Sequence, residues 1–323
     1  MRVLATSINP ADLNQIEGRY PILPKALPAI PGNESVGEVL EVGSAVSGLK
    51  TGDWCVPSVA GAGGQWRTHW GPGPAASWIG LPPGLMPLES AATLTVSSCT
   101  ALRMLEDFVE LRPGVDAVVQ NGGTSAVGRA VTQLCRARGI SSVSLLRRRA
   151  KSGGASSGTT DDEAMRAEIL ALGADHVLFE DEIRDRKPQL RGLNFSLGLN
   201  CVGGESGARV AKLLAHGAHL VTYGGMSKEP VVGPTGLFVF KDLRFRGFWM
   251  TRWMNDVATT DDKAAMISRL AELIRRGALH SAVEIFDLET EWRQAIEMAT
   301  APSKAAKPVL RCCSRWYFHG RYR

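Results

Sequence analysis

Short apolar runs alternate with amphipathic segments through the middle of the chain. The apolar runs predict buried strands at Ala117–Gln120, Ser142–Leu146, His176–Phe179, Ser196–Cys201 and His219–Tyr223. Between them, apolar residues recur at helical spacing and predict helices at Val127–Arg138, Asp161–Leu172 and Ser206–His216. Strands that alternate with helices are typical of a doubly wound parallel sheet, so this region predicts an α/β fold.

The chain before this region follows a different pattern. From Arg2 to about Ser97, short apolar runs are punctuated by glycine and proline, which indicates a β-rich lobe. Asn9–Gly18 interrupts it with the pattern of a short capped helix that ends at a glycine, and this helix delivers Tyr20 into a proline-bounded loop. Tyr20 is a candidate acid, and packing against the nearby prolines is the other open interpretation.

The remainder of the chain extends this two-lobe pattern. Phe238–Trp249 has a strand-like pattern, and its even-numbered aromatic residues can line an acyl pocket, pair edge to edge with a second copy, or simply pack in the core. Helices predicted at Asp261–Arg276 and Glu289–Thr300 precede a closing strand at Lys307–Leu310. We therefore expect one domain from residues 1–96 with 262–323, and a second from residues 97–261.

The stretch after the first central strand carries the candidate chemistry. Gly122–Ala126 are small residues that allow a tight turn directly before a helix. A strand, turn and helix in this order direct free backbone N–H groups and the positive end of a helix dipole at one point, which suits a pyrophosphate. The glycine motif is degenerate, because Ser125 and Ala126 stand where a stricter dinucleotide motif has glycine, and a plain turn is the alternative.

Three arginines follow the next strand, about 20 residues beyond the turn, where the adenosine ribose of a dinucleotide lies. A carboxylate at this place favours NAD, whereas Arg147, Arg148 and Arg149 offer donors and charge for a 2′-phosphate. The sequence therefore favours NADPH, and a solvated basic run is the alternative.

Two glycine turns, Cys201–Gly204 and Tyr223–Met226, follow the fourth and fifth predicted strands. Ligands of open parallel sheets bind outside the carboxyl ends of the strands, so both turns are expected to face the cofactor. Plain strand-ending turns are the alternative.

Composition narrows the class of protein. With 323 residues, 44% of them apolar and 21% charged, the chain is long enough for two globular domains. No apolar run reaches the roughly 18 residues of a membrane helix, so a membrane is not an expected partner. The net charge of +5 falls largely on Arg147–Arg149 and on the arginines after Leu310, so a nucleic acid is not an expected partner either. The six cysteines include no Cys-x-x-Cys pair, which indicates a reducing compartment.

Specific motifs resemble a known superfamily. Gly32-Asn33-Glu34 stands where zinc alcohol dehydrogenases of the medium-chain dehydrogenase/reductase superfamily carry Gly-His-Glu, so the resemblance implies a GroES-like first domain, a Rossmann second domain and a zinc-independent branch. Within that superfamily the chain is similar to the mitochondrial trans-2-enoyl-CoA (acyl carrier protein) reductases, especially plant-like members. The motifs that carry this similarity are Ile8–Pro21, Cys99–Leu105, Asn200–Gly204, Val221–Lys228, Phe240–Leu243 and Arg246–Trp249.

The resemblance implies NADPH-dependent reduction of the 2,3 double bond of an enoyl thioester, on CoA or acyl carrier protein, in mitochondrial fatty acid synthesis. It places the catalytic tyrosine on Tyr20, implies a homodimer, and implies no metal. The implied cofactor contacts are Ser97, Thr124, Ser125, Ala126, Val127, Arg147, Arg148, Arg149, Tyr223, Gly224, Gly225, Met226, Phe248, Trp249, Met250, Thr251 and Lys307.

Departures from this family are also informative. Ser97 replaces a usual asparagine, Arg148 replaces an aspartate common in the family, and Lys151–Thr160 is an insertion next to the expected phosphate site. Family members also carry a transit peptide and further strands before the point that matches Met1, so the chain is expected to be amino-terminally truncated. Two alternative functions stay open, a zinc-free quinone or enone oxidoreductase and a non-catalytic NADPH-binding isoform.

Overall fold

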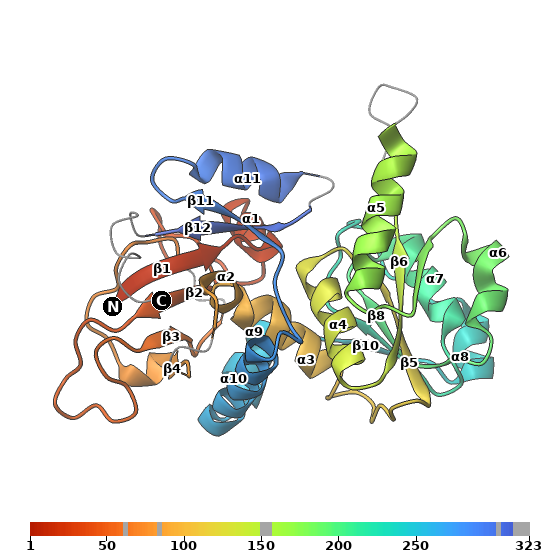
Figure 1. Cartoon of the computed structure of the whole chain (residues 1–323), viewed down its shortest axis with the longest axis horizontal. Helices are drawn as coiled ribbons and strands as arrows, with labels where there is room; N and C mark the ends of the chain where they lie inside the picture. The colour runs from red at the N-terminus through yellow and green to blue at the C-terminus, as the bar shows by residue number, and fades with distance from the viewer. Residues whose placement is uncertain (61–63, 83–85, 149–156, 302–304, 313–323) are drawn as a thin grey trace. The chain divides into compact units, whose positions relative to one another are not determined.

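The structure is a computed structural model that describes residues 1–60, 64–82, 86–148, 157–301 and 305–312 (Figure 1). The chain divides into two compact units, Met1–Cys99 with Met250–Arg323, and Thr100–Trp249. None of the described helices has the length and apolar character that crossing a membrane requires.

The second unit contains a six-stranded parallel sheet in the order β10-β9-β8-β5-β6-β7. Its strands are β5 (Asp116–Asn121), β6 (Ser141–Leu146), β7 (His176–Phe179), β8 (Asn194–Asn200), β9 (His219–Thr222) and β10 (Arg244–Gly247). The order reverses at β5, because β6 and β7 lie on one side of it and β8, β9 and β10 on the other. This reversal is the topological switch point at which open α/β sheets bind ligands.

Helices cover both faces of this sheet. Side chains alternate along β5, so Val119 packs with Val210 of α7 (Gly204–Leu213) on one face. On the other face, Gln120 donates from Nε2 to the Gly128 carbonyl of α4 (Ala126–Ala137) at 2.9 Å. The predicted doubly wound α/β fold is confirmed.

The remaining helices of this unit pack at the sheet ends and edges. Met165 and Ile169 of α5 (Ser157–Ala171) form a small core with Phe179. The other elements are α6 (Ile183–Arg186), the 3-10 helix η3 (Lys187–Leu190) and α8 (Thr235–Lys241).

The predicted strand over Phe238–Trp249 is wrong for its first part, which forms α8, and only Arg244–Gly247 is a strand. Aromatic residues favour strands, but helical spacing here brings Phe238 against Phe245, with ring centroids 4.8 Å apart. Asp242 then ends the helix in the left-handed conformation with φ +48°.

The first unit contains a mixed six-stranded sheet in the order β11-β12-β1-β2-β3-β4. Its strands are β1 (Arg2–Ser7), β2 (Ser35–Glu38), β3 (Trp54–Pro57), β4 (Trp78–Gly80), β11 (Val283–Asp287) and β12 (Lys307–Arg311), and Figure 1 shows them in this order. β12 pairs antiparallel with β1 and parallel with β11, so the end of the chain completes a sheet that begins at its start.

Short helices and turns surround this sheet. Ile8 and Leu310 pack with Ala295 and Ala299 of α11 (Trp292–Thr300), which fixes α11 against the sheet. The other elements are α1 (Pro10–Ile16), η1 (Ala75–Ser77), α2 (Leu88–Ala91), the π-helix η2 (Leu94–Ser98), α9 (Met250–Arg252), the π-helix η4 (Trp253–Val257) and α10 (Thr260–Arg275), and α3 (Cys99–Met104) runs across the boundary into the second unit.

Candidate functional site

The turn between β5 and α4 brings the first residues of the helix close to the end of the strand. Gly122 has φ +62°, and the Ser125 hydroxyl at the start of α4 accepts from the Gly128 N–H at 3.0 Å. A Cβ at Gly128 would lie 2.5 Å from the Gly122 carbonyl oxygen, so the helix can start this close to the strand only with glycine at that position. Thr124, Ser125, Ala126 and Val127 are half-buried at this helix start, and their N–H groups and helix dipole suit an anion.

The glycine turn after β9 lies at the same end of the sheet. β8 ends at Asn200 and β9 at Thr222, which are direct neighbours in the sheet. The Tyr223 N–H donates to the Asn200 carbonyl at 2.9 Å and the Met226 N–H to the Cys201 carbonyl at 3.0 Å. Gly225 is exposed and a Cβ there would meet nothing within 4 Å, so this turn is open on one side.

An unpaired hydroxyl marks the same place. The Tyr223 hydroxyl is buried and completes no hydrogen bond among the described residues. Burial, followed by the neighbouring Cys201 thiol, raises the pKa of Tyr223 well above its ordinary value, and burial also raises the pKa of Cys201. Tyr223 is therefore a neutral hydroxyl beside Cys201 and Ser125 that completes no well-formed hydrogen bond with a described residue, and the oxygens of a bound dinucleotide can accept one from it. Together with the helix start of α4, this orphan donor fits a dinucleotide cofactor.

Two asparagines at the strand ends hold these turns, and the sequence analysis missed both. The Asn121 amide donates to Asn200 Oδ1 at 2.7 Å and to the Ser206 hydroxyl at 3.0 Å. Asn200 Oδ1 also accepts from the N–H of Gly203 at 3.0 Å. An asparagine at the last position of a buried strand was the signal available for both.

The three predicted arginines have different environments. Arg147 is exposed, and within the described part of the chain it has no ion pair. Arg148 pairs with carboxylates instead, since its Nε lies 2.8 Å from Asp181 and its Nη2 lies 2.8 Å from Glu182. Arg149 lies outside the described residues.

The predicted run from Phe248 to Thr251 spans the boundary between the two units. The Phe248 N–H donates to the Thr222 carbonyl at 2.9 Å, which fixes this residue beside the end of β9. Trp249 is 38% exposed, so part of its side chain is accessible from outside the chain. Met250 and Thr251 are buried in α9 of the first unit.

Tyr20 lies in the loop after α1 and is half-buried. Asp12 accepts from the Asn9 N–H at 2.6 Å at the start of the helix, and Gly18 ends the helical turn with φ +69°. The Gln15 side chain donates to the Ile22 carbonyl at 3.1 Å and so links the helix to the far side of the loop that carries Tyr20. The predicted short capped helix before Tyr20 is confirmed, and the role of Tyr20 stays a prediction.

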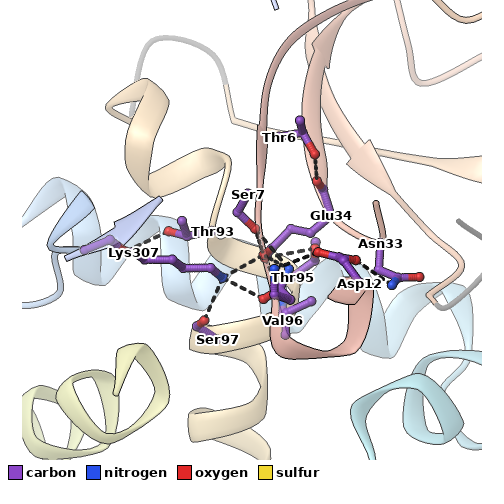
Figure 2. A network of polar contacts seen from close by, with 12 residues as sticks. Thr6, Ser7, Asp12, Asn33, Glu34, Thr93, Thr95, Val96, Ser97 and Lys307 are labelled. Atoms are coloured by element: carbon purple, nitrogen blue, oxygen red, sulfur yellow. Dashed lines mark hydrogen bonds and ion pairs between the residues drawn. The ribbon is translucent and has the colours of Figure 1, made fainter. Parts of the chain in front are cut away.

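A buried charged network in the first unit holds this helix (Figure 2). Glu34 is fully buried and ion-paired to Lys307 Nζ at 3.1 Å. The same ammonium donates to Asn9 Oδ1 at 2.8 Å and to the Ser97 hydroxyl at 3.1 Å, so its three donors are all used. Ser97 and Lys307, both predicted cofactor contacts, therefore lie together in this network, and their contact with a cofactor stays a prediction.

Both carboxylate oxygens of Glu34 accept further hydrogen bonds. Oε1 accepts from the Val96 N–H of the π-helix η2 at 2.7 Å, and Oε2 accepts from the Ser7 hydroxyl at 2.5 Å. Glu34 belongs to the Gly-Asn-Glu motif, but the sequence alone did not identify it as the centre of this network. Its partners Ser7, Val96 and Lys307 are far from one another in the sequence.

Asn33 occupies the place of the histidine in zinc enzymes and here serves a different purpose. Its amide Nδ2 donates to Asp12 Oδ1 at 2.6 Å and to Gln15 Oε1 at 2.7 Å, as Figure 2 shows for Asp12. Burial raises the pKa of Asp12 from 3.8 to about 7, against the lowering effect of its hydrogen bonds. Asn33 therefore fastens α1 to the sheet. Among the residues that the structure describes, no three His, Cys, Asp or Glu side chains form a group that could hold a metal ion.

Comparison with known proteins extends over both units. Residues 1–85 match the family model of the alcohol dehydrogenase GroES-like domain, and residues 126–272 match that of the zinc-binding dehydrogenases. The chain is 42% identical to the mitochondrial enoyl-[acyl-carrier-protein] reductase of Rattus norvegicus, over 96% of this chain and 80% of that protein. It is 44% identical to the protein of the same name from Arabidopsis thaliana, over 93% of this chain and 76% of that protein.

Solved structures show the same likeness. A mitochondrial 2-enoyl thioester reductase heterodimer from Candida tropicalis has a TM-score of 0.83 at 33% identity, covering 96% of this chain and 89% of that chain. A structure described as a complex of Etr1p with NADP and crotonyl-CoA has a TM-score of 0.83 at 34% identity, with the same coverage. A putative NADPH:quinone reductase from Bacillus thuringiensis, at 23% identity over 96% of this chain and 88% of that one, has a TM-score of 0.77 and shows the shared fold alone.

Proposed function

We infer the function from one premise: this chain belongs to the family of the mitochondrial enoyl-[acyl-carrier-protein] reductases. It is an NADPH-dependent oxidoreductase that reduces the 2,3 double bond of trans-2-enoyl thioesters. The observation that carries this conclusion is the similarity, over 96% of the chain, to a solved complex with NADP and crotonyl-CoA. The quinone or enone reductase alternative has only a shared fold in its support.

The cofactor site is proposed at the carboxyl ends of β5, β6, β8 and β9. The start of α4 at Thr124–Val127 would hold the pyrophosphate, and Tyr223–Met226 would border the cofactor, with the Tyr223 hydroxyl as a donor. Arg147, exposed and unpaired among the described residues, is the proposed ligand of the adenosine 2′-phosphate. When bound, NADPH supplies the hydride that reduces the double bond.

Tyr20 is the proposed acid of the first unit. Negative charge grows on the thioester oxygen when the double bond is reduced, and a neutral phenol can donate a hydrogen bond or a proton to that enolate. The buried network of Asn9, Asp12, Asn33, Glu34 and Lys307 would keep α1, and hence the loop of Tyr20, in one position. We propose Trp249 as a wall of the acyl site, because an apolar chain is bound by burial.

We propose that the acyl chain is carried on CoA or on acyl carrier protein. We also propose a mitochondrial location, which rests on the names of the relatives. We further propose a homodimer, which is supported by a similar solved structure that is a heterodimer. The second unit offers a surface for the dimer. β10 is an edge strand that pairs only with β9 among the described strands, and next to it α8 exposes Val239 to 66% and Phe240 to 80%. An unpaired edge beside an exposed apolar helix is suited to a second copy.

Purified protein mixed with crotonyl-CoA and NADPH tests the function directly. We expect NADPH to be consumed only when the thioester is present, with butyryl-CoA as the product identified by mass spectrometry. NADH should replace NADPH poorly. A small quinone in place of crotonyl-CoA is the matched control: consumption with the quinone but not with crotonyl-CoA would favour the sibling activity, and none with either would leave a protein that only binds the cofactor.

A further inference from the structure

Arg148 connects the ends of two neighbouring strands of the second unit. β6 ends at Leu146 and β7 at Phe179, and these two residues are direct partners in the sheet. The Arg148 guanidinium lies over the Phe179 ring, 4.3 Å from its centroid. Its Nε, Nη2 and Nη1 lie 2.8 Å from Asp181, 2.8 Å from Glu182 and 3.4 Å from Asp162. This stacking and pairing hold the side chain in one orientation.

The carboxylates of this group depend on Arg148 to different degrees. Glu182 is also held by Arg166 at 2.8 Å and by Arg186 at 3.5 Å. Asp181 is 62% exposed, and among the described residues Arg148 is the only cation paired with it. The hydrogen bond from Arg148 is the main cause that lowers the pKa of Asp181. Without Arg148, no cation among the described residues would pair with the negative charge of Asp181.

The position of this charge matters because of its neighbour. The adenosine 2′-phosphate of NADPH is bound at the end of the second strand of such a sheet, which is the end of β6 here. Arg147, the proposed phosphate ligand, comes directly before Arg148 in the chain. An uncompensated carboxylate close to this end of the sheet would repel the phosphate and weaken its binding.

We propose that Arg148 is a positioning residue that determines cofactor specificity. Arg148 neutralises Asp181 and its acidic neighbours, and the second unit can therefore accept the 2′-phosphate of NADPH. Arg148 itself does not contact this phosphate. This inference rests on the proposed function in that it takes NADPH as the cofactor. Arg147 is then the phosphate ligand, and Arg148 sets the potential in which the phosphate binds. This role of Arg148 is inferred from its ion pairs with Asp181 and Glu182, and not from its position in a run of three arginines.

Calorimetric titration with 2′,5′-ADP and with 5′-AMP tests the proposal without any turnover. Arg148→Met removes the charge but keeps an unbranched side chain to pack on Phe179. We expect this variant to bind 2′,5′-ADP about fivefold more weakly at low ionic strength and 5′-AMP nearly unchanged. Arg275→Met is the matched control, since Arg275 is also a half-exposed arginine paired with a glutamate, but belongs to the first unit. It should leave both affinities unchanged.

A second substitution separates screening from direct contact. If Arg148 acts through Asp181, then Arg148→Met combined with Asp181→Asn should regain most of the lost affinity for 2′,5′-ADP. Asp181→Asn alone should bind 2′,5′-ADP as well as the unsubstituted protein or better. A loss that Asp181→Asn does not restore would show that Arg148 contacts the phosphate itself, and no loss in Arg148→Met would show that this charge does not act on the site. Either result overturns the proposal.

Thermal unfolding of each variant, followed by circular dichroism, keeps a folding defect apart from a binding effect. If Arg148→Met does not fold, Arg148→Gln offers the same test with a hydrogen-bonding side chain. A chain that binds 2′,5′-ADP but does not reduce crotonyl-CoA would contradict the proposed function and still decide the role of Arg148.

Discussion

Tyr20 is the residue on which the proposed chemistry depends. Tyr20→Phe removes only the hydroxyl, so it should leave the loop after α1 in place and remove the donor to the developing enolate. We expect kcat for crotonyl-CoA to fall by about 10² to 10⁴, with little change in the KM for NADPH. Steady-state kinetics with NADPH loss as the signal measures both constants.

An unchanged kcat in Tyr20→Phe would assign the proton donor to another group and would favour the quinone or enone reductase. Binding of 2′,5′-ADP by the variant serves as the control, because Tyr20 and the proposed cofactor turns belong to different units.

Asp12 makes the stability of the first unit depend on pH. Its pKa is about 7 in the folded protein because of burial, compared with 3.8 for an ordinary aspartate. Between these two values the folded chain holds a proton that the unfolded chain has released. Stability is therefore expected to decline by up to about 1.4 kcal/mol per pH unit as the pH rises from near 4 to about 7, and this contribution should be constant above that.

Asp12→Asn removes this titration. We expect the variant to be less stable overall, because an amide nitrogen replaces one acceptor of the Asn9 and Asn33 hydrogen bonds, but to show a flatter dependence on pH. Urea unfolding between pH 5 and pH 8 measures the slope. Asp185→Asn, an exposed aspartate of α6, is the control and should keep the slope of the parent protein. Equal slopes in all three proteins would contradict a raised pKa for Asp12.

Among the elements, the junction of β5 and α4 is the most constrained. A Cβ at Gly128 would lie 2.5 Å from the Gly122 oxygen and 2.8 Å from the Gly123 Cα, and both are backbone atoms that cannot turn aside. Gly128→Ala should therefore shift the helix start, destabilise the second unit by about 1 to 3 kcal/mol, and weaken the binding of 2′,5′-ADP.

Gly236→Ala is the matched control, because it also lies in a helix and its Cβ would meet the Phe240 ring at an ordinary 3.5 Å. Calorimetry and urea unfolding compare the two variants. If Gly128→Ala bound 2′,5′-ADP as the parent does, the close approach of α4 to the turn would be irrelevant to the cofactor.

The comparison of these elements with the sequence shows what a local pattern can predict. The order of strand, glycine turn and helix around Gly122 was predictable because one continuous segment of chain contains the entire signal. The network around Glu34 was not, because it joins Ser7, Val96 and Lys307, which are distant in the sequence. Phe238–Trp249 was misassigned because aromatic β-propensity and helical packing against Phe245 compete within the same few residues.

At the scale of the whole molecule, the proposed homodimer places Phe240 in an interface. Phe240→Asp puts a charge on a side chain that is 80% exposed in one chain and would be buried in the pair. We expect the parent protein to sediment as a dimer and the variant to dissociate at concentrations at least about tenfold higher, a shift that corresponds to about 1.4 kcal/mol. Leu170→Asp, at another exposed apolar position, should keep the dimer. A parent protein that sediments as a monomer would contradict the proposal.

The position of β12 in the first sheet also affects the order in which the two units can fold. β12 enters the first sheet between β11 and β1, and its Lys307 reaches Asn9 across 298 positions of the chain. A chain that emerges amino terminus first therefore has Glu34 without its ammonium partner, and β1 without one neighbouring strand, until residues 307–311 have emerged. The Thr100–Trp249 unit is continuous and does not depend on β12. We therefore expect the nucleotide-binding unit to fold first, and the unit that carries Tyr20 to complete its fold only after β12 has emerged.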